Sequence, residues 1–279
     1  MQVAIVAHHR TSTNVALTLA RPGLRILEPA TAARTLGEGD VAIGRLDVSE
    51  GLDGIETGLW ELARLEGAGV RVLNRPRTLV AAHDKLATSR ALGDAGGPHP
   101  RTAHVTSPSD NVPFEPPVVV KPRFGSWGQD VVLCRDAAAL RRHLAAMAER
   151  PWFASHGALV QELVPPKGHD VRVIVAGSSV VGAIRRVAPP GEWRTNVALG
   201  AVREPVEPSS EACELAIRAA AAVEGDLVGV DLLPRHDGEF VVIEINGAVE
   251  FNAAYSLHGA DVFHRTLEAV LPDPVAAVA

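Results

Sequence analysis

Hydrophobic and polar positions follow two different periods along the first third of the chain. Short apolar runs with the length of buried strands lie at residues 2–7, 40–43 and 70–73. Residues 12–20 and 55–67 instead repeat apolar side chains every three to four positions, which is typical of helices. Strands that alternate with helices indicate an open α/β sheet. The pattern therefore predicts a small N-terminal α/β domain, which we place at residues 1–80.

Three polar residues, His8, His9 and Arg10, directly follow the first predicted strand. Open parallel sheets place ligand contacts at the carboxyl ends of their strands, although a solvated turn fits this short segment equally well. No glycine-rich dinucleotide fingerprint follows the strand, and no Gly-Lys-Ser/Thr sequence occurs in the chain. Neither a nicotinamide cofactor nor a P-loop is therefore indicated.

The middle of the chain predicts a helix over residues 82–92 with Asp84 near its start, followed by a proline-rich linker over residues 107–117. Two apolar strands within residues 118–134 then flank a loop that contains Gly125 and Gly128. Glycines let backbone N–H groups approach phosphate oxygens closely, and Lys121 on the entering strand would add a cation. A plain β-hairpin with a surface lysine is the alternative interpretation of this stretch.

The next segments predict a helix over residues 136–150, a strand over residues 157–164 and a hairpin formed by residues 170–176 and 179–186. Asp170, Arg172 and Arg185 alternate with apolar residues in this hairpin. Alternation predicts that the three charges share one face of the sheet. An irregular loop over residues 187–202 and a helix over residues 210–223 complete this part of the chain.

A second hairpin near the C-terminus carries a candidate metal site. Its strands are predicted at residues 228–233 and 239–245, on either side of a Pro-Arg-His-Asp-Gly turn. Strand pairing would aim oxygen atoms of Asp231, Glu244 and Asn246 from one face, and Mg²⁺ prefers such carboxylate and amide oxygens. Polar strand ends that face water are the alternative. The last predicted helix covers residues 262–270, and the tail after it is expected to fray.

Composition narrows the class of protein. The chain has 279 residues, 47% of them hydrophobic, which is sufficient for a globular protein with a sizeable core. Its net charge of −6, with no long run of one sign, indicates neither nucleic-acid nor membrane binding. Cys134 and Cys213 lie in separate segments, so both are expected to be reduced thiols in a cytoplasmic protein. The N-terminus lacks the pattern of a signal peptide.

The order of these features resembles the ATP-grasp superfamily, and within it the RimK/LysX branch of ATP-dependent carboxylate–amine ligases. The matching series is Asn74-Arg75-Pro76, Asp84-Lys85, Ala87-Thr88-Ser89, Lys121-Pro122, Gly125-Ser126-Trp127-Gly128, Gln161-Glu162-Leu163-Val164, Asp170-x-Arg172, Arg194-Thr195-Asn196, Asp231, Glu244-x-Asn246 and Glu250-Phe251. It is most similar to the LysX ligases, which join an amino acid to an amino-group carrier protein. The tryptophan within the glycine loop is part of that similarity.

The resemblance implies an α/β ATP-grasp fold in three parts. These are an N-terminal Rossmann-like pre-ATP-grasp domain at residues 1–80, a lid subdomain at residues 81–159, and a C-terminal metal and nucleotide subdomain at residues 160–272. The implied cofactors are ATP and Mg²⁺, with Mn²⁺ as a substitute. The branch commonly forms homodimers or homotetramers, which we expect here as well.

Roles for individual residues follow from the same resemblance. ATP contacts are implied for Lys85, Lys121, Ser126, Trp127, Gly128, Gln161, Glu162, Leu163, Val164, Asp170, Arg194 and Asn196. Among these, the two lysines hold phosphates, Gln161 to Val164 contact adenine, and Asp170 lies on the ribose side. Metal ligation is implied for Asp231, Glu244 and Asn246, and contact with phosphates or the substrate carboxylate for the catalytic candidates Arg172 and Arg185.

The implied reaction forms an amide through an acyl phosphate. The amine is that of an amino-acid substrate, and the carboxylate is the C-terminal Glu of a small acidic carrier protein. One position departs from the branch, because Leu199 replaces the arginine of an Arg-Gly-Gly sequence that follows the Asn. Two alternatives therefore stay open: a RimK-type α-L-glutamate ligase that acts on a protein or small molecule, and a nucleotide-binding homologue without turnover.

Overall fold

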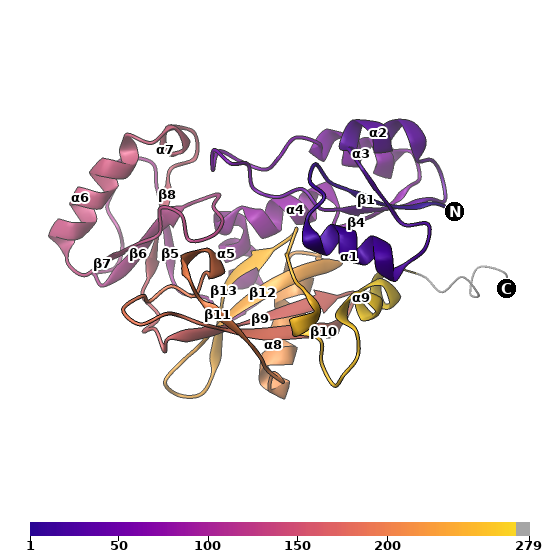
Figure 1. Ribbon diagram of the computed structural model, residues 1–279. Helices are drawn as coiled ribbons and strands as arrows, with labels where there is room; N and C mark the ends of the chain where they lie inside the picture. The colour runs from indigo at the N-terminus through magenta and orange to yellow at the C-terminus, as the bar shows by residue number, and fades with distance from the viewer. Residues whose placement is uncertain (272–279) are drawn as a thin grey trace.

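The computed structural model describes residues 1–271, so the expected fraying of residues 272–279 lies outside the described part. Within it, the chain forms three β-sheets with helices packed around them (Figure 1). No helix among the described residues is both long and apolar enough to cross a membrane.

The N-terminal sheet is parallel, with strand order β2-β1-β3-β4. Its elements are β1 (Val3–Val6), α1 (Ser12–Ala20), β2 (Arg25–Leu27), α2 (Pro29–Thr35), β3 (Val41–Gly44), α3 (Leu59–Gly67) and β4 (Arg71–Leu73). Thr11 caps α1 by accepting the N–H of Asn14, as the polar cluster at this position favours. The predicted alternation of strands and helices is confirmed. Hydropathy did not indicate β2 and α2, because β2 is short and partly exposed and α2 carries little apolar surface.

The second sheet is antiparallel, with order β5-β8-β6-β7, and lies at the left of the view, away from the N-terminal sheet at the right (Figure 1). It contains β5 (Thr102–Val105), β6 (Val118–Pro122), β7 (Val132–Cys134), α6 (Ala137–Ala148), α7 (Pro151–His156) and β8 (Ala158–Glu162). The apolar stripe of α6, formed by Leu140, Leu144 and Met147, packs in one core with Val118 and Val120 of β6. The stripe is therefore part of the hydrophobic core, as its helical spacing indicates.

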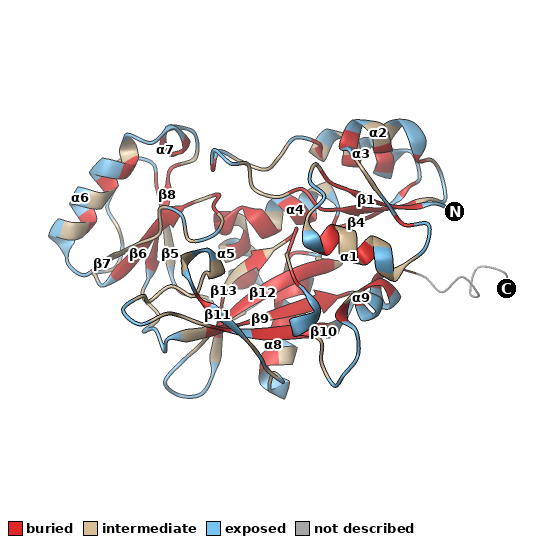
Figure 2. Cartoon of the chain, in the orientation of Figure 1, coloured by how far each residue is buried: buried red, intermediate tan, exposed pale blue. Residues whose placement is uncertain are grey.

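The third and largest sheet is also antiparallel, with order β11-β10-β9-β12-β13. It consists of β9 (His169–Ala176), β10 (Ser179–Val187), β11 (Val202–Pro205), β12 (Leu227–Pro234) and β13 (Phe240–Asn246), with α8 (Ser210–Ala222), α9 (Val262–Val270) and the short helices η1 (Val197–Leu199) and η2 (Ala253–Tyr255) beside it. Alternate residues of β9 enter different cores: Val173 belongs to the core with α8, and Ile174 to the core with α1 and α9. The sheet is therefore buried on both faces over most of its area (Figure 2).

One predicted helix is divided in two. The expected helix over residues 82–92 is instead the end of α4 (Pro76–His83) and most of α5 (Lys85–Asp94). Asp84 separates them, because its carboxylate accepts the N–H groups of Leu86 and Ala87 and so caps α5. It also forms an ion pair with Arg123. The break places Lys85 in the first turn of α5, next to the strand that carries Lys121.

Asn74 connects the N-terminal sheet to the third sheet. It follows β4 with a left-handed φ of 53° and is fully buried. Its side-chain nitrogen donates to the carbonyls of Leu227 (2.6 Å) and Gly247 (2.9 Å), and its side-chain oxygen accepts the N–H groups of Asp226 (2.9 Å) and Leu227 (3.0 Å). The asparagine amide thus holds the start of β12 beside the end of β13.

We expect Asn74→Ala to reduce the free energy of unfolding by about 3 kcal/mol, because the buried backbone groups around it lose their partners. Urea unfolding followed by circular dichroism measures this loss. Asn111→Ala, at an exposed position in the proline-rich linker, is the control and should change stability by less than about 0.5 kcal/mol. Equal effects of the two substitutions would contradict the proposed connection.

Candidate active site

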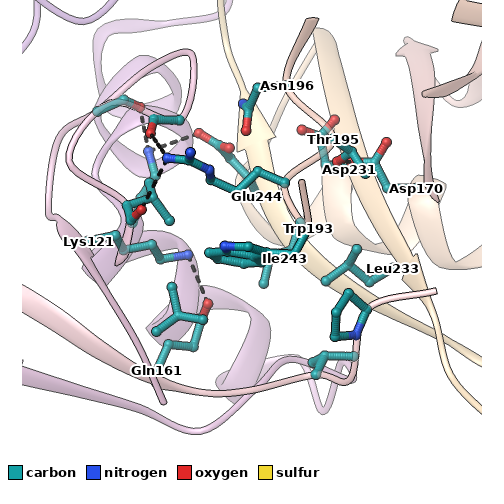
Figure 3. A pocket seen from close by; sticks show the side chains of 18 of the residues that line it. Lys121, Gln161, Asp170, Trp193, Thr195, Asn196, Asp231, Leu233, Ile243 and Glu244 are labelled. Atoms are coloured by element: carbon teal, nitrogen blue, oxygen red, sulfur yellow. Dashed lines mark hydrogen bonds and ion pairs between the residues drawn. The ribbon is translucent and has the colours of Figure 1, made fainter. Parts of the chain in front are cut away.

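A pocket opens between the second and third sheets, and we call it the central pocket (Figure 3). It is lined by most of the predicted site residues, namely Lys85, Lys121, Ser126, Trp127, Gly128, Gln161, Glu162, Leu163, Val164, Asp170, Arg194, Asn196, Asp231 and Glu244. These residues come from the two antiparallel sheets, the start of α5, the glycine loop after β6, the segment after β8 and the loop before η1. Segments more than 150 residues apart in the sequence therefore face one cavity.

One side of the central pocket is apolar. Val119, Leu163, Val164, Trp193, Leu233 and Ile243 contribute to it. Figure 3 shows the Trp193 ring beside Ile243. Flat apolar surfaces of this kind accommodate an aromatic ring system. Trp193 was not among the predicted site residues, since it lies in a loop whose course the hydropathy pattern does not reveal.

Two lysines enter the opposite side of the pocket. The Lys121 ammonium donates to Gln161 Oε1 at 2.8 Å, and the Lys85 ammonium donates to the carbonyl of Gly125 at 2.6 Å and pairs with Glu244 Oε1 at 2.8 Å. Burial, together with the nearby Lys85 charge, lowers the pKa of Lys121 to about 8. Two buried cations so close together indicate an anionic ligand.

Two arginines and two aspartates form a buried ion network. Arg172 binds both oxygens of Asp231, at 2.6 and 2.7 Å, and Arg186 Nη2 contacts Asp231 Oδ2 at 2.8 Å. Arg186 also donates to both oxygens of Asp170, and Thr195 donates its hydroxyl to Asp170 at 2.6 Å. Both Asp170 oxygens are thus already bound, although the resemblance implies that this residue faces a ribose.

The two aspartates differ in their electrostatic surroundings. Burial favours the neutral form of both, but Arg172 and Arg186 outweigh it at Asp231 and hold its pKa down to about 2. At Asp170 burial prevails over Arg186 and raises the pKa, with the neighbouring Asp231 charge acting in the same direction. Asp231 is therefore the firmly ionised member of the pair.

Arg185 does not belong to this network. It lies on the opposite face of β10, where it forms an exposed ion pair with Glu204 of β11. The expectation that Arg185 shares a face with Asp170 and Arg172 is therefore wrong. The residue in that place is Arg186, which pairs with Asp170 across the β9–β10 ladder and which the sequence pattern did not single out.

A β-bulge explains the difference. The ladder starts by pairing Ala176 with Ser179, and a regular register from there would place Arg185 opposite Asp170. The register shifts by one residue between Val180 and Gly182, which moves every later side chain of β10 to the other face. Gly182 fits this position because a Cβ atom there would lie 2.9 Å from the carbonyl oxygen of Tyr255.

The glycine loop covers the central pocket. Trp127 and Gly128 both have positive φ, and Trp127 remains 70% exposed. A Cβ atom on Gly128 would lie 2.7 Å from Asn196 Oδ1 and 3.1 Å from Leu199 Cδ1, so the loop rests directly on the segment before η1. Arg194 joins the two segments by donating to the carbonyls of Gly128 and Val131, each at 3.3 Å. Leu199 therefore packs against the loop.

A second hollow, the arginine pocket, adjoins the central pocket and shares Arg186, Asn196 and Glu244 with it. Arg172, Arg203 and Asn246 line it as well, so two predicted site residues that are missing from the lining of the central pocket lie here. The carboxylates of Asp47, Glu244 and Glu250 line the hollow too. Its three arginines are the side chains that suit a carboxylate or phosphate.

The candidate metal ligands lie together, but the two carboxylates among them are already paired with cations. Asp231 faces Glu244 across the β12–β13 ladder, and Asn246 follows two residues later. No cluster of three His, Cys, Asp or Glu side chains arranged for a metal ion occurs within residues 1–271. The oxygen donors suit Mg²⁺ in kind. Because Asp231 is held by arginines and Glu244 by Lys85, a cation could bind only if anionic groups arrived with it and drew these side chains away.

Fold and site together define an ATP-grasp enzyme, whose ligand pocket lies between two antiparallel sheets. The RimK-like ATP-grasp domain family matches residues 82–270, and the chain belongs to this family. It is an ATP-dependent carboxylate–amine ligase, as the motif series implied.

Two curated relatives are LysW ligases. The chain is 32% identical over 248 residues to the glutamate–LysW ligase ArgX of Sulfurisphaera tokodaii, covering 86% of this chain and 85% of that protein. It is 28% identical over 208 residues to the α-aminoadipate–LysW ligase LysX of Saccharolobus solfataricus, covering 73% and 75%. The crystal structure of a RimK domain ATP-grasp protein from Sphaerobacter thermophilus matches with a TM-score of 0.68 at 22% identity, covering 98% of this chain and all of that chain. The predicted ATP-grasp fold is confirmed.

The neighbouring arginines of β10 provide a matched pair of substitutions. Arg186→Met should reduce the free energy of unfolding by about 3–5 kcal/mol, because buried Asp170 then loses its arginine partner and Asp231 keeps only Arg172. Arg185→Met removes only an exposed pair and should cost less than about 1 kcal/mol. Urea unfolding at neutral pH measures both values, and a larger loss for Arg185→Met would contradict the register described above.

Proposed function

We propose that the enzyme transfers the γ-phosphoryl group of ATP to the C-terminal Glu of a small acidic carrier protein and then joins the acyl phosphate to the α-amine of an amino acid. The observation that carries this proposal is the contact between the two pockets. The central pocket, with its two buried lysines, adjoins the arginine pocket, with its three arginines. Arg186 and Glu244 line both pockets. Nucleotide and carboxylate can thus be held side by side.

In this proposal ATP occupies the central pocket. The apolar side formed by Val119, Leu163 and Ile243 takes the adenine, and Lys85 and Lys121 bind the phosphates on the other side. Phosphoryl transfer depends mainly on cations around the spreading negative charge and on in-line positioning, so no protein nucleophile is needed. The glycine loop, joined to the opposite segment by Arg194, keeps water from the acyl phosphate when it is closed.

Asp231, Glu244 and Asn246 would hold Mg²⁺ that arrives with ATP. When bound, the ion would neutralise charge on the phosphates. Lys85, which pairs with Glu244 in this structure, can turn to the phosphates and free that carboxylate. Asn246 Nδ2 is buried without a hydrogen-bond partner among residues 1–271, and rotation of the amide would present its oxygen instead.

The arginine pocket takes the carboxylate that is phosphorylated. Arg172 and Arg203 line it together with Arg186, which gives an anionic chain end several guanidinium partners. The two LysW ligases described above carry the name of a carrier protein, and their similarity to this chain supports a carrier as the acceptor here. The expected homodimer or homotetramer stays a prediction.

The direct test uses a synthetic acidic peptide that ends in glutamate, together with ATP, Mg²⁺ and hydroxylamine. Hydroxylamine traps an acyl phosphate as a hydroxamate, and we expect peptide hydroxamate and ADP in equal amounts. Glu244→Gln should reduce the rate by roughly 100-fold, because it removes a negative charge that the metal–phosphate complex needs. Glu239→Gln, an exposed position on the same hairpin, is the control.

A wild-type protein that binds ATP but forms no hydroxamate with any carboxylate peptide would contradict the proposed reaction. It would favour a nucleotide-binding role without turnover. Repeated addition of glutamate to the peptide, visible by mass spectrometry when glutamate replaces hydroxylamine, would instead favour a RimK-type α-L-glutamate ligase.

The pKa of Lys121 predicts a pH dependence of ATP binding. Its value of about 8 means that the side chain is charged below pH 8 and loses its proton as the pH rises through 8. Bound phosphates favour the charged form, so the dissociation constant for ATP should increase up to about tenfold per pH unit above 8. Calorimetric titration from pH 7 to 9.5 measures this. Lys121→Arg, which stays charged, should flatten the profile, and parallel profiles would exclude Lys121 as the cause.

A further inference from the structure

A third hollow, the N-terminal pocket, lies at the carboxyl ends of β1 and β3, and nothing so far assigns it a ligand. It adjoins the arginine pocket, since Asp47, Ala248 and Glu250 line both. Trp127, on the exposed tip of the glycine loop, lines all three pockets. A molecule in the N-terminal pocket therefore lies next to the proposed carboxylate site.

The lining of this pocket is predominantly acidic. Four carboxylates contribute to it, namely those of Asp47, Glu50, Glu56 and Glu250. The basic side chains among its lining residues are Arg45, which pairs with Glu250 at 2.9 Å, and His9, which lies 3.1 Å from Glu56. The arginine pocket beside it is lined by three arginines and three carboxylates, those of Asp47, Glu244 and Glu250. The excess of carboxylates therefore lies in the N-terminal pocket.

Arg45 provides an independent indication of a ligand. Its side chain is only 1% exposed and lines the pocket. Nε donates to Asn14 at 2.5 Å and Nη2 to the carbonyl of Val249 at 2.7 Å, but Nη1 has no hydrogen-bond partner within residues 1–271. A buried N–H group of a guanidinium without an acceptor is unfavourable, and a bound carboxylate oxygen would supply the missing acceptor.

We propose that the N-terminal pocket binds the amine substrate as an α-amino acid, with its ammonium group among the carboxylates and its α-carboxylate at Arg45. This assignment rests on the proposed ligase function and names the substrate class of its second half-reaction. The charge of the pocket further selects amino acids without a second carboxylate, and most strongly those with a cationic side chain.

The selection follows from net charge. At neutral pH an acidic amino acid carries −1, an aliphatic amino acid 0 and a diamino acid +1, as their reference pKa values dictate. Four carboxylates, one arginine and one histidine line the pocket. Repulsion between like charges therefore disfavours binding of an acidic amino acid, and attraction favours binding of a diamino acid. The preferred amine therefore differs in charge from the glutamate and α-aminoadipate in the names of the two LysW ligases.

Calorimetric titration of the full chain with L-lysine and with L-glutamate tests the proposal without requiring turnover. The titration is done in the presence of Mg²⁺, a non-hydrolysable ATP analogue and a saturating acidic peptide that ends in glutamate and so fills the arginine pocket. L-Lysine should bind at least tenfold more tightly than L-glutamate. Glu56→Gln, which keeps the shape of the side chain, should weaken lysine binding roughly fivefold. Glu268→Gln, an exposed position on α9 outside all three pockets, should leave it unchanged.

Glutamate binding as tight as lysine binding, or lysine binding that Glu56→Gln does not change, would overturn the assignment. The hydroxylamine assay separates this failure from a failure of the proposed function, because hydroxylamine is small and uncharged and does not depend on the pocket. If hydroxamate forms but lysine binds no more tightly than glutamate, the ligase reaction is supported and the assignment of the amine substrate is wrong. If lysine binds but no hydroxamate forms, the pocket is an amino-acid site and the proposed reaction is wrong.

Discussion

The buried ion network of Arg172, Arg186, Asp170 and Asp231 sets the electrostatics on which the rest of the site depends. Its groups lie on three adjacent strands of the third sheet, and each charge is matched by an opposite charge in direct contact. Breaking one member leaves an uncompensated charge in a buried place, which destabilises a protein far more than losing an exposed pair. The charges of the network are thus balanced without a ligand. In the proposed function these ion pairs rearrange when phosphates, a metal ion and a carboxylate bind together.

Two further buried polar groups connect this sheet to the N-terminal sheet. Asn74 holds the start of β12 beside the end of β13, and Arg45 joins the carboxyl end of β3 to the carbonyls and carboxylate at residues 248–250. The segment after the metal-ligand candidates is therefore shared between two sheets. The three pockets accordingly adjoin one another, with Trp127 in the lining of each. The N-terminal sheet, which has no nucleotide fingerprint of its own, contributes residues to the third pocket.

Much of this arrangement could be predicted from the sequence, because local patterns determine it. Helices α1 and α9 begin and end where their caps and apolar periodicity predict, and the β12–β13 hairpin follows from its turn. The predictions that proved wrong depend on contacts between residues that are far apart in the sequence. Arg186 replaces Arg185 in the network because a bulge at Gly182, packed against Tyr255, reverses the faces of β10. The division between α4 and α5 depends on Asp84, whose capping role a continuous apolar stripe conceals.

In the proposed reaction a carboxylate oxygen becomes part of the phosphate that is released. A peptide whose C-terminal glutamate carboxylates carry ¹⁸O tests this most directly, with the released inorganic phosphate analysed by mass spectrometry after a single round of amide formation. We predict one ¹⁸O atom in each phosphate, because the acyl phosphate loses its bridging oxygen to phosphate when the amine attacks. Phosphate without ¹⁸O, formed at the same rate as ADP, would show that water receives the phosphoryl group and would contradict the account.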